Sequence, residues 1–72
     1  MGVKAERHAK DLIEGDIIRV GDLYALIYSV EETKGHHVRM SLHYTGFDLT
    51  TITVVPSIAI FELAPFSASI KR

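Results

Sequence analysis

The sequence predicts an all-β protein, built as one small barrel of five strands. Short β-rich runs recur about every ten residues, and turns that contain glycine, proline or aspartate separate them. Apolar residues make up 47% of the 72, and the net charge is −1, which is the composition of a folded chain. Cysteine is absent, so the burial of a core must hold the domain together without disulfides or thiolate metal sites.

The N-terminal third predicts an arm, a turn and a tight hairpin. Residues 4–12 have only a weak apolar stripe, so we expect a frayed arm or one or two helical turns that contribute little to the fold. Gly15 then gives the backbone freedom to turn before a first strand over residues 16–20. The Gly21-Asp22 pair links this strand to a second one over residues 23–30, as in a two-residue hairpin.

The second and third strands carry the apolar pattern of the predicted barrel. Both faces of the second strand are largely apolar, with Tyr24, Leu26, Tyr28 and Val30 on one and Ala25, Ile27 and Ser29 on the other. Residues 31–36 are polar and predict an exposed hairpin loop. Residues 37–44 alternate strictly, which predicts that Val38, Met40, Leu42 and Tyr44 are buried and that His37, Arg39, Ser41 and His43 face solvent.

Two further strands complete the barrel. Gly46 marks a turn, and the threonine-rich residues 49–55 favour a fourth strand. Pro56 interrupts the pattern, and residues 58–63 resume it as a fifth strand that Pro65 ends. The expected layout is therefore an arm (1–10), a barrel (11–64) and a tail (65–72). Closure of the sheet removes exposed edges, which favours an SH3-like barrel, with an oligonucleotide-binding-type barrel as the alternative.

Several short motifs follow one another between residues 10 and 63. They are Asp11-Leu12, Gly15-Asp16-Ile17-Ile18, Gly21-Asp22-Leu23-Tyr24, Val30-Glu31, Lys34-Gly35, Val38-Arg39 with Leu42, and Thr45-Gly46. Their order resembles the N-terminal SH3-like (KOW-like) domain of bacterial elongation factor P and its hypusine-carrying relatives. The resemblance implies the fold and suggests contact with RNA or the ribosome. The family's loop is longer and presents a modified lysine, whereas Lys34 matches the lysine that opens that loop, so no modification is carried over.

The sequence contains no recognisable catalytic or cofactor motif. There is no G-x-S-x-G nucleophile elbow and no phosphate-binding glycine loop, and the acidic residues stand where turns ordinarily need them. His37 and His43 share a predicted face, but six residues of extended strand separate them by about 20 Å, too far to ligate one ion. We therefore expect no enzymatic activity, no cofactor, no metal and no small-molecule substrate.

Exposure in the predicted fold selects the candidate partner-binding residues. Most aromatic residues in strands, namely Tyr24, Tyr28, Tyr44 and Phe61, are expected in the core. The candidates for contact with a partner are Lys34, His36, His37, Arg39, His43, Phe47 and Phe66.

The function expected from these observations is that of a non-enzymatic binding module or adaptor. It would bind a protein partner or its own copies through exposed strand edges, the loop 31–37 and the tail that begins at Phe66, as in a small phage or bacterial accessory or assembly protein. The alternative is an RNA- or ribosome-binding module, which the low net charge disfavours. The N-terminus lacks an apolar signal-peptide core and no run approaches the roughly 20 apolar residues of a membrane helix, so we expect a cytoplasmic protein.

Overall fold

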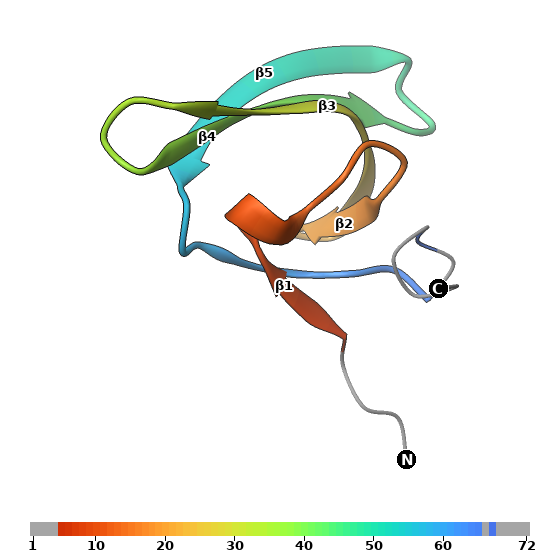
Figure 1. The fold of residues 1–72 in the computed structure, drawn as a ribbon. Coiled ribbons are helices and arrows are strands. Elements are labelled where there is room, and N and C mark those ends of the chain that lie inside the picture. Colours follow the sequence, from red (N-terminus) through yellow and green to blue (C-terminus); the bar gives the residue numbers. More distant parts are fainter. Residues whose placement is uncertain (1–4, 66, 68–72) are drawn as a thin grey trace.

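The structure, a computed structural model, describes residues 5–65 and residue 67, and this part of the chain is all-β. Its strands form two antiparallel sheets, one with the order β2-β3-β4-β5 and one that pairs β1 with β6 (Figure 1). The strands are β1 (Glu6–His8), β2 (Ile17–Val20), β3 (Leu23–Thr33), β4 (His37–Tyr44), β5 (Leu49–Pro56) and β6 (Ile60–Glu62), and the 3-10 turn η1 (Ala9–Asp11) follows β1.

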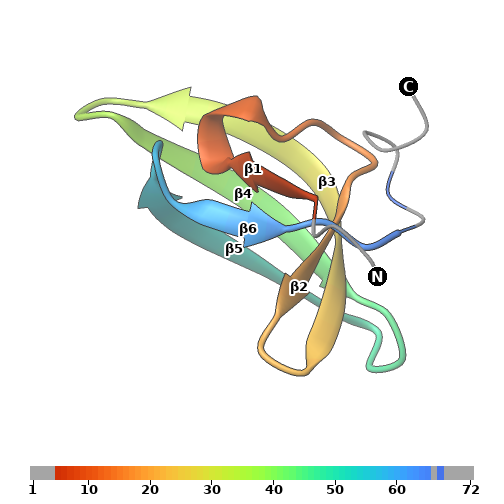
Figure 2. The same ribbon diagram turned by 90° about the horizontal axis from the view of Figure 1, so that it is seen from below.

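The two sheets face each other across the core. In Figure 1 the strands β3, β4 and β5 lie above, and the segment of β1 and η1 lies below them; Figure 2 shows the β1–β6 pair crossing the larger sheet. Backbone bonds join the sheets at β2, where Ile18 bridges to Leu63 and the Ala64 N–H donates to the Ile17 carbonyl at 2.8 Å. The chain that leaves β6 therefore lies along the outer edge of β2.

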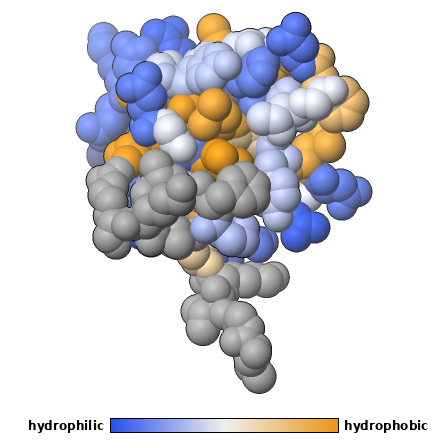
Figure 3. All heavy atoms as spheres, turned by 90° about the vertical axis from the view of Figure 1, so that its right-hand side faces the viewer, coloured by the Kyte–Doolittle hydropathy of each residue, from blue (hydrophilic) through white to orange (hydrophobic). Residues whose placement is uncertain are grey.

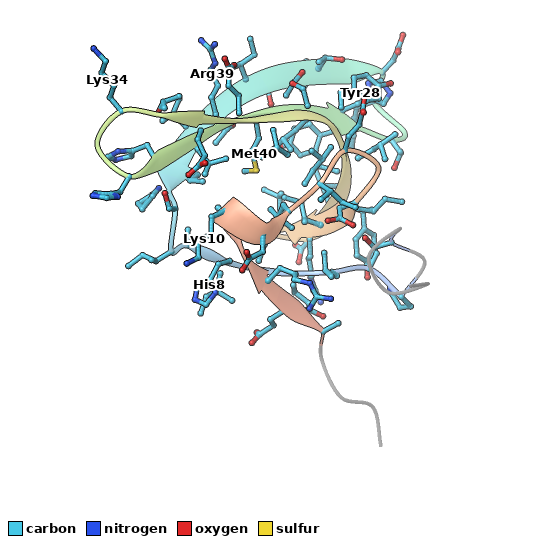
Figure 4. The ribbon with its side chains drawn as sticks, in the orientation of Figure 1. His8, Lys10, Tyr28, Lys34, Arg39 and Met40 are labelled. Carbon is cyan, nitrogen blue, oxygen red and sulfur yellow. The ribbon has the colours of Figure 1, made fainter. Side chains whose placement is uncertain are left out.

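The predicted alternation of β4 is confirmed. Val38, Met40 and Leu42 are buried, whereas His37 and Arg39 are exposed. Figure 4 shows the two directions, because Met40 points from β4 toward η1 and Arg39 points away from the core. The buried apolar cluster consists of Ala9, Leu12, Ile18, Ala25, Ile27, Val38, Met40, Leu42 and Leu63.

The prediction for the aromatic residues of β3 is wrong at two positions. Tyr24 and Tyr28 are exposed, because Ala25 and Ile27 fill the core-facing side of this strand. A β-bulge between Ile27 and Ser29 then shifts the register by one residue. Val30 was expected on the same face of the strand as Tyr28. Because of this shift, Val30 packs against the core and Tyr28 does not. Tyr44 and Phe61 are half-buried and pack against the core as expected.

The N-terminal segment contributes more to the fold than its sequence predicted. Only η1 corresponds to the expected helical turn, and residues 6–8 form a strand that pairs with β6. Ala9 and Leu12 are buried, and the Ala9 N–H donates to the Ala59 carbonyl at 2.7 Å. The apolar pattern of residues 4–12 is too weak to predict this role. One strand of three residues and two buried side chains are nevertheless enough to cover one side of a small core.

Loop lengths also differ from the expectation. β3 continues through Thr33, which pairs with His37, so the predicted loop 31–36 shrinks to Lys34-Gly35-His36. Gly35 and His36 both have positive φ, at 76° and 62°, as a tight connection between two strands requires. The fifth predicted strand is shorter as well, since β6 begins only at Ile60.

A buried polar cluster fixes the start of β2. The Ser67 hydroxyl donates to Asp16 Oδ1 at 2.9 Å and accepts the Ile17 N–H at 3.1 Å. The other carboxylate oxygen, Asp16 Oδ2, accepts the Ile13 N–H at 3.0 Å. Asp16 and Ser67 are both fully buried. Asp16 is thus more than a turn residue, because it ties the chain beyond β6 to the edge of β2.

Candidate interaction surface

The predicted partner-binding residues do not gather at one place. Lys34 and His36 lie in the β3–β4 loop, and Phe47 lies in the turn at the other end of β4. The eight residues of β4 separate these ends by about 25 Å. His37, Arg39 and His43 lie between them on the outer face of β4, and Phe66 falls outside the described residues.

Arg39 is already paired within the chain. Its Nη2 donates to Glu31 Oε1 at 2.8 Å, across the β3–β4 ladder in which the two residues are opposite. The hydrogen bond to Glu31 and the negative charge of that carboxylate both raise the pKa of the Arg39 guanidinium above its ordinary value. The charge of Arg39 is therefore balanced by its neighbour.

His43 is also engaged by neighbours on the same face. Its ring stacks on Tyr28, with centroids 5.2 Å apart and an interplanar angle of 8°. Its Nδ1 lies 3.1 Å from Thr50 Oγ1, within hydrogen-bond distance across the β4–β5 ladder. The outer face of β3 and β4 thus holds two groups of side chains that engage one another, Arg39 with Glu31 and His43 with Tyr28 and Thr50.

The strand β5 differs from its neighbours because its outer side is apolar. Its eight residues, Leu49–Pro56, include no charged side chain. Ile52 is 71% exposed and Val54 is 55% exposed, and both lie on the outer face. Ile52 is opposite Ser41 and Val54 is opposite Arg39 in the ladder, so small or polar side chains of β4 flank them on one side only.

Backbone groups of β5 are available on that open side. Among the described residues β5 pairs only with β4, and the ladder between them has no bulge. The Ser57 N–H donates to the His36 carbonyl at 2.8 Å, which identifies this pair as a hydrogen-bonded one. Because bonded and non-bonded pairs alternate in an antiparallel ladder, the N–H and C=O groups of Ile52 and Val54 point away from β4. We call β5 with these outward groups the open edge.

A second apolar surface lies where the two hairpin turns meet. A groove of about 660 Å³ is lined by Val20, Leu23, Tyr44, Phe47, Leu49 and Thr51. Phe47, the predicted candidate in the turn, is 63% exposed here. Figure 3, which looks at this side of the molecule, shows apolar groups gathered beside polar ones. This groove adjoins the open edge, because Leu49 begins β5.

The described residues contain neither a cluster of potential metal ligands nor a membrane-spanning helix. No group of three His, Asp or Glu side chains converges in a way that could hold a metal ion within residues 5–65 and 67. Over the same residues, no helix is long and apolar enough to cross a membrane.

Comparison with known proteins assigns no relative to this chain. No protein family, curated protein or solved structure matches it. The surface chemistry of the chain itself is therefore what points to a function.

The residues most characteristic of the open edge were not among those predicted. Ile52 and Val54 belong to a run that reads as an ordinary half-buried strand. Two sequence signals were available: the absence of any charge from residue 49 to residue 56, and the alternation of threonine with Ile52 and Val54. Natural edge strands usually carry charge or proline to prevent pairing. β5 carries no charge, and its one proline, Pro56, stands at its end, so neither device protects the edge at Ile52 and Val54.

Proposed function

We propose that this chain is a non-enzymatic protein-interaction module that binds an extended segment of a protein along β5. The observation that carries the proposal is the open edge, where the backbone groups of Ile52 and Val54 point outward beside exposed apolar side chains. An extended segment added to such an edge gains main-chain hydrogen bonds, and alternate side chains give it specificity.

The proposal includes the finer architecture of an SH3-like barrel. Two features support it: β2 to β5 follow one another as a meander, and the chain around Leu63 returns to pair with Ile18 of β2. The motif order that resembles the elongation factor P domain is consistent with the same architecture. In this arrangement β5 is an edge strand of the larger sheet.

A catalytic role is less well supported because the polar groups of the outer face engage one another. Glu31 binds Arg39, and His43 lies against Tyr28 and Thr50. A general acid or base needs a proton of the substrate within reach, and these groups lie on a flat strand surface.

An RNA- or ribosome-binding module is the alternative, and the elongation factor P resemblance favours it. Arg19, Lys34, Arg39 and the loop histidines His36 and His37 would supply the phosphate contacts. Two observations weigh against it, because Arg39 is neutralised by Glu31 and the chain carries a net charge of −1.

The test is selection of binders from a random decapeptide library displayed on phage, followed by amide hydrogen exchange with a selected peptide. We expect extended apolar peptides whose binding slows exchange at the N–H groups of Ile52 and Val54, and we expect Ile52→Lys to abolish binding. The matched control is Ile60→Lys, because Ile60 is similarly exposed, at 60%, but belongs to β6.

Two outcomes would contradict the proposal. One is a failure to select any peptide that protects the open edge. The other is salt-sensitive binding of a structured RNA that is lost in Lys34→Glu and unaffected by Ile52→Lys, which would favour the RNA-binding alternative.

A further inference from the structure

We infer that the segment bound at the open edge is β5 of a second copy of this chain, in an antiparallel two-fold dimer whose axis passes beside Thr53. This inference rests on the proposed function and names the partner at the same site. Dimers of identical chains most often have two-fold symmetry, and the same surface patch then serves both copies. The open edge meets this condition because its sequence complements itself when reversed.

Side chains determine the register. With Thr53 of each copy opposite the other, Ile52 of one copy is opposite Val54 of the second, and the same pair repeats on the other side of the axis. These side chains lie on the outer face and are largely exposed in the single chain. Moving the axis to Ile52 would place Val54 opposite Thr50, which leaves less apolar surface in contact.

Backbone groups fit the same register. Ile52 and Val54 direct their N–H and C=O groups outward, so each Ile52–Val54 pair between the copies can exchange both hydrogen bonds. Pro56 is then opposite Thr50 of the second copy. The proline lacks an N–H, but its carbonyl can accept the Thr50 N–H, so it limits the ladder only at its end.

The two ends of β5 are complementary as well. Asp48 precedes the strand, and the Lys34–His36 loop lies beside its other end, where the Ser57 N–H binds the His36 carbonyl. Antiparallel pairing brings Asp48 of one copy toward the basic loop of the second. It also brings the exposed Leu49 toward Ile58, which is 72% exposed just beyond β5.

Charge does not oppose the approach of the two β5 edges. Arg39 lies next to Val54 in the ladder, but its pairing with Glu31 leaves that row without net charge. A joined sheet would therefore run from β2 of one copy to β2 of the other without placing unpaired like charges at its centre.

The first test is the solution mass, measured by sedimentation velocity over a wide range of protein concentration. We expect a monomer–dimer equilibrium whose dissociation constant rises about a hundredfold in Ile52→Lys, since the dimer contains two copies of each substitution. Ile60→Lys should leave the constant unchanged. A wild-type chain that stays monomeric up to millimolar concentration would overturn the inference, and so would a dimer that Ile52→Lys does not weaken.

The second test fixes the register by single cysteines, which the natural sequence lacks. Thr53→Cys should form a disulfide-linked dimer readily, because residues at the axis of a non-hydrogen-bonded pair have Cα atoms about 4.5 Å apart, within the range that a disulfide spans. Thr51→Cys is the matched control, on the same face of the same strand, and its two thiols should be about 13 Å apart. Efficient linkage of Thr51→Cys in place of Thr53→Cys would refute the register.

Failure of the dimer and failure of the proposed function give different results. A monomer whose open edge still binds selected peptides would leave the function intact and refute the second copy as partner. A monomer whose open edge binds no peptide would refute both.

Discussion

The two edges of the four-stranded sheet end in opposite ways. At β2, the outer backbone groups are used by the chain itself: the Ile17 carbonyl accepts the Ala64 N–H, and the Ile17 N–H donates to Ser67 Oγ. At β5, the corresponding groups of Ile52 and Val54 meet no backbone partner among the described residues. One edge is closed within the chain, and the other is open within the described residues.

The chemistry of the side chains follows the same division. The closed edge is tied by a fully buried carboxylate and hydroxyl, Asp16 and Ser67, which are costly to bury unless each finds its partner. The open edge carries threonine and aliphatic residues that tolerate either water or another strand. Buried polar groups specify one arrangement of the chain at the closed edge. An uncharged, β-rich edge has no such requirement and leaves room for an added strand.

The largest effect is expected from Asp16→Ala at the closed edge. The substitution removes the acceptor of both the Ser67 hydroxyl and the Ile13 N–H in a buried site, so we expect the free energy of unfolding to fall by about 2–4 kcal/mol. Urea denaturation followed by circular dichroism measures it. The control is Glu14→Ala, an exposed acid in the same turn, which should change stability by less than about 0.5 kcal/mol. Equal effects of the two substitutions would mean that the carboxylate does not tie the edge.

A smaller effect is expected from Ser67→Ala. Loss of the hydroxyl removes one hydrogen bond to Asp16 and one from the Ile17 N–H, but no charge is deleted, so we expect a loss of about 1–2 kcal/mol. The exposed Ser29→Ala serves as the control in the same denaturation experiment. Sedimentation should show unchanged self-association, because the closed edge is separate from the open one. A change in dimer affinity comparable to that of Ile52→Lys would contradict the division between the edges.

The sequence predicted the all-β class and the strict alternation of β4 because these depend on local periodicity. Val38, Met40 and Leu42 could be assigned to the core from their spacing alone. The core position of Val30 could not, because the bulge before it changes the face of the residues that follow without changing the sequence pattern. The pairing of Asp16 with Ser67 was equally hidden, since it joins positions 51 residues apart.

The open edge was predictable only in part. Exposed strand edges were expected to bind a partner, but nothing in the sequence identified β5 as the last strand of the sheet. That assignment depends on which strands pair, and pairing is a property of the whole chain. The predicted site residues at the loop and on β4 were instead chosen for their predicted exposure, and the structure shows that Arg39 and His43 are engaged by Glu31 and Tyr28.

The smallest effect is expected on the outer face beside the open edge. The stacked rings of Tyr28 and His43 are partly exposed, so a double-mutant cycle with alanine at both positions should give a coupling free energy of only about 0.5–1 kcal/mol. Thermal or urea denaturation of the four proteins measures this coupling. Weak coupling is consistent with a face that can accept a neighbouring strand at little cost to the single chain. A coupling free energy above about 2 kcal/mol would contradict the contrast between the two edges. The side chains beside the open edge would then stabilise the sheet as strongly as Asp16 and Ser67 stabilise the closed edge.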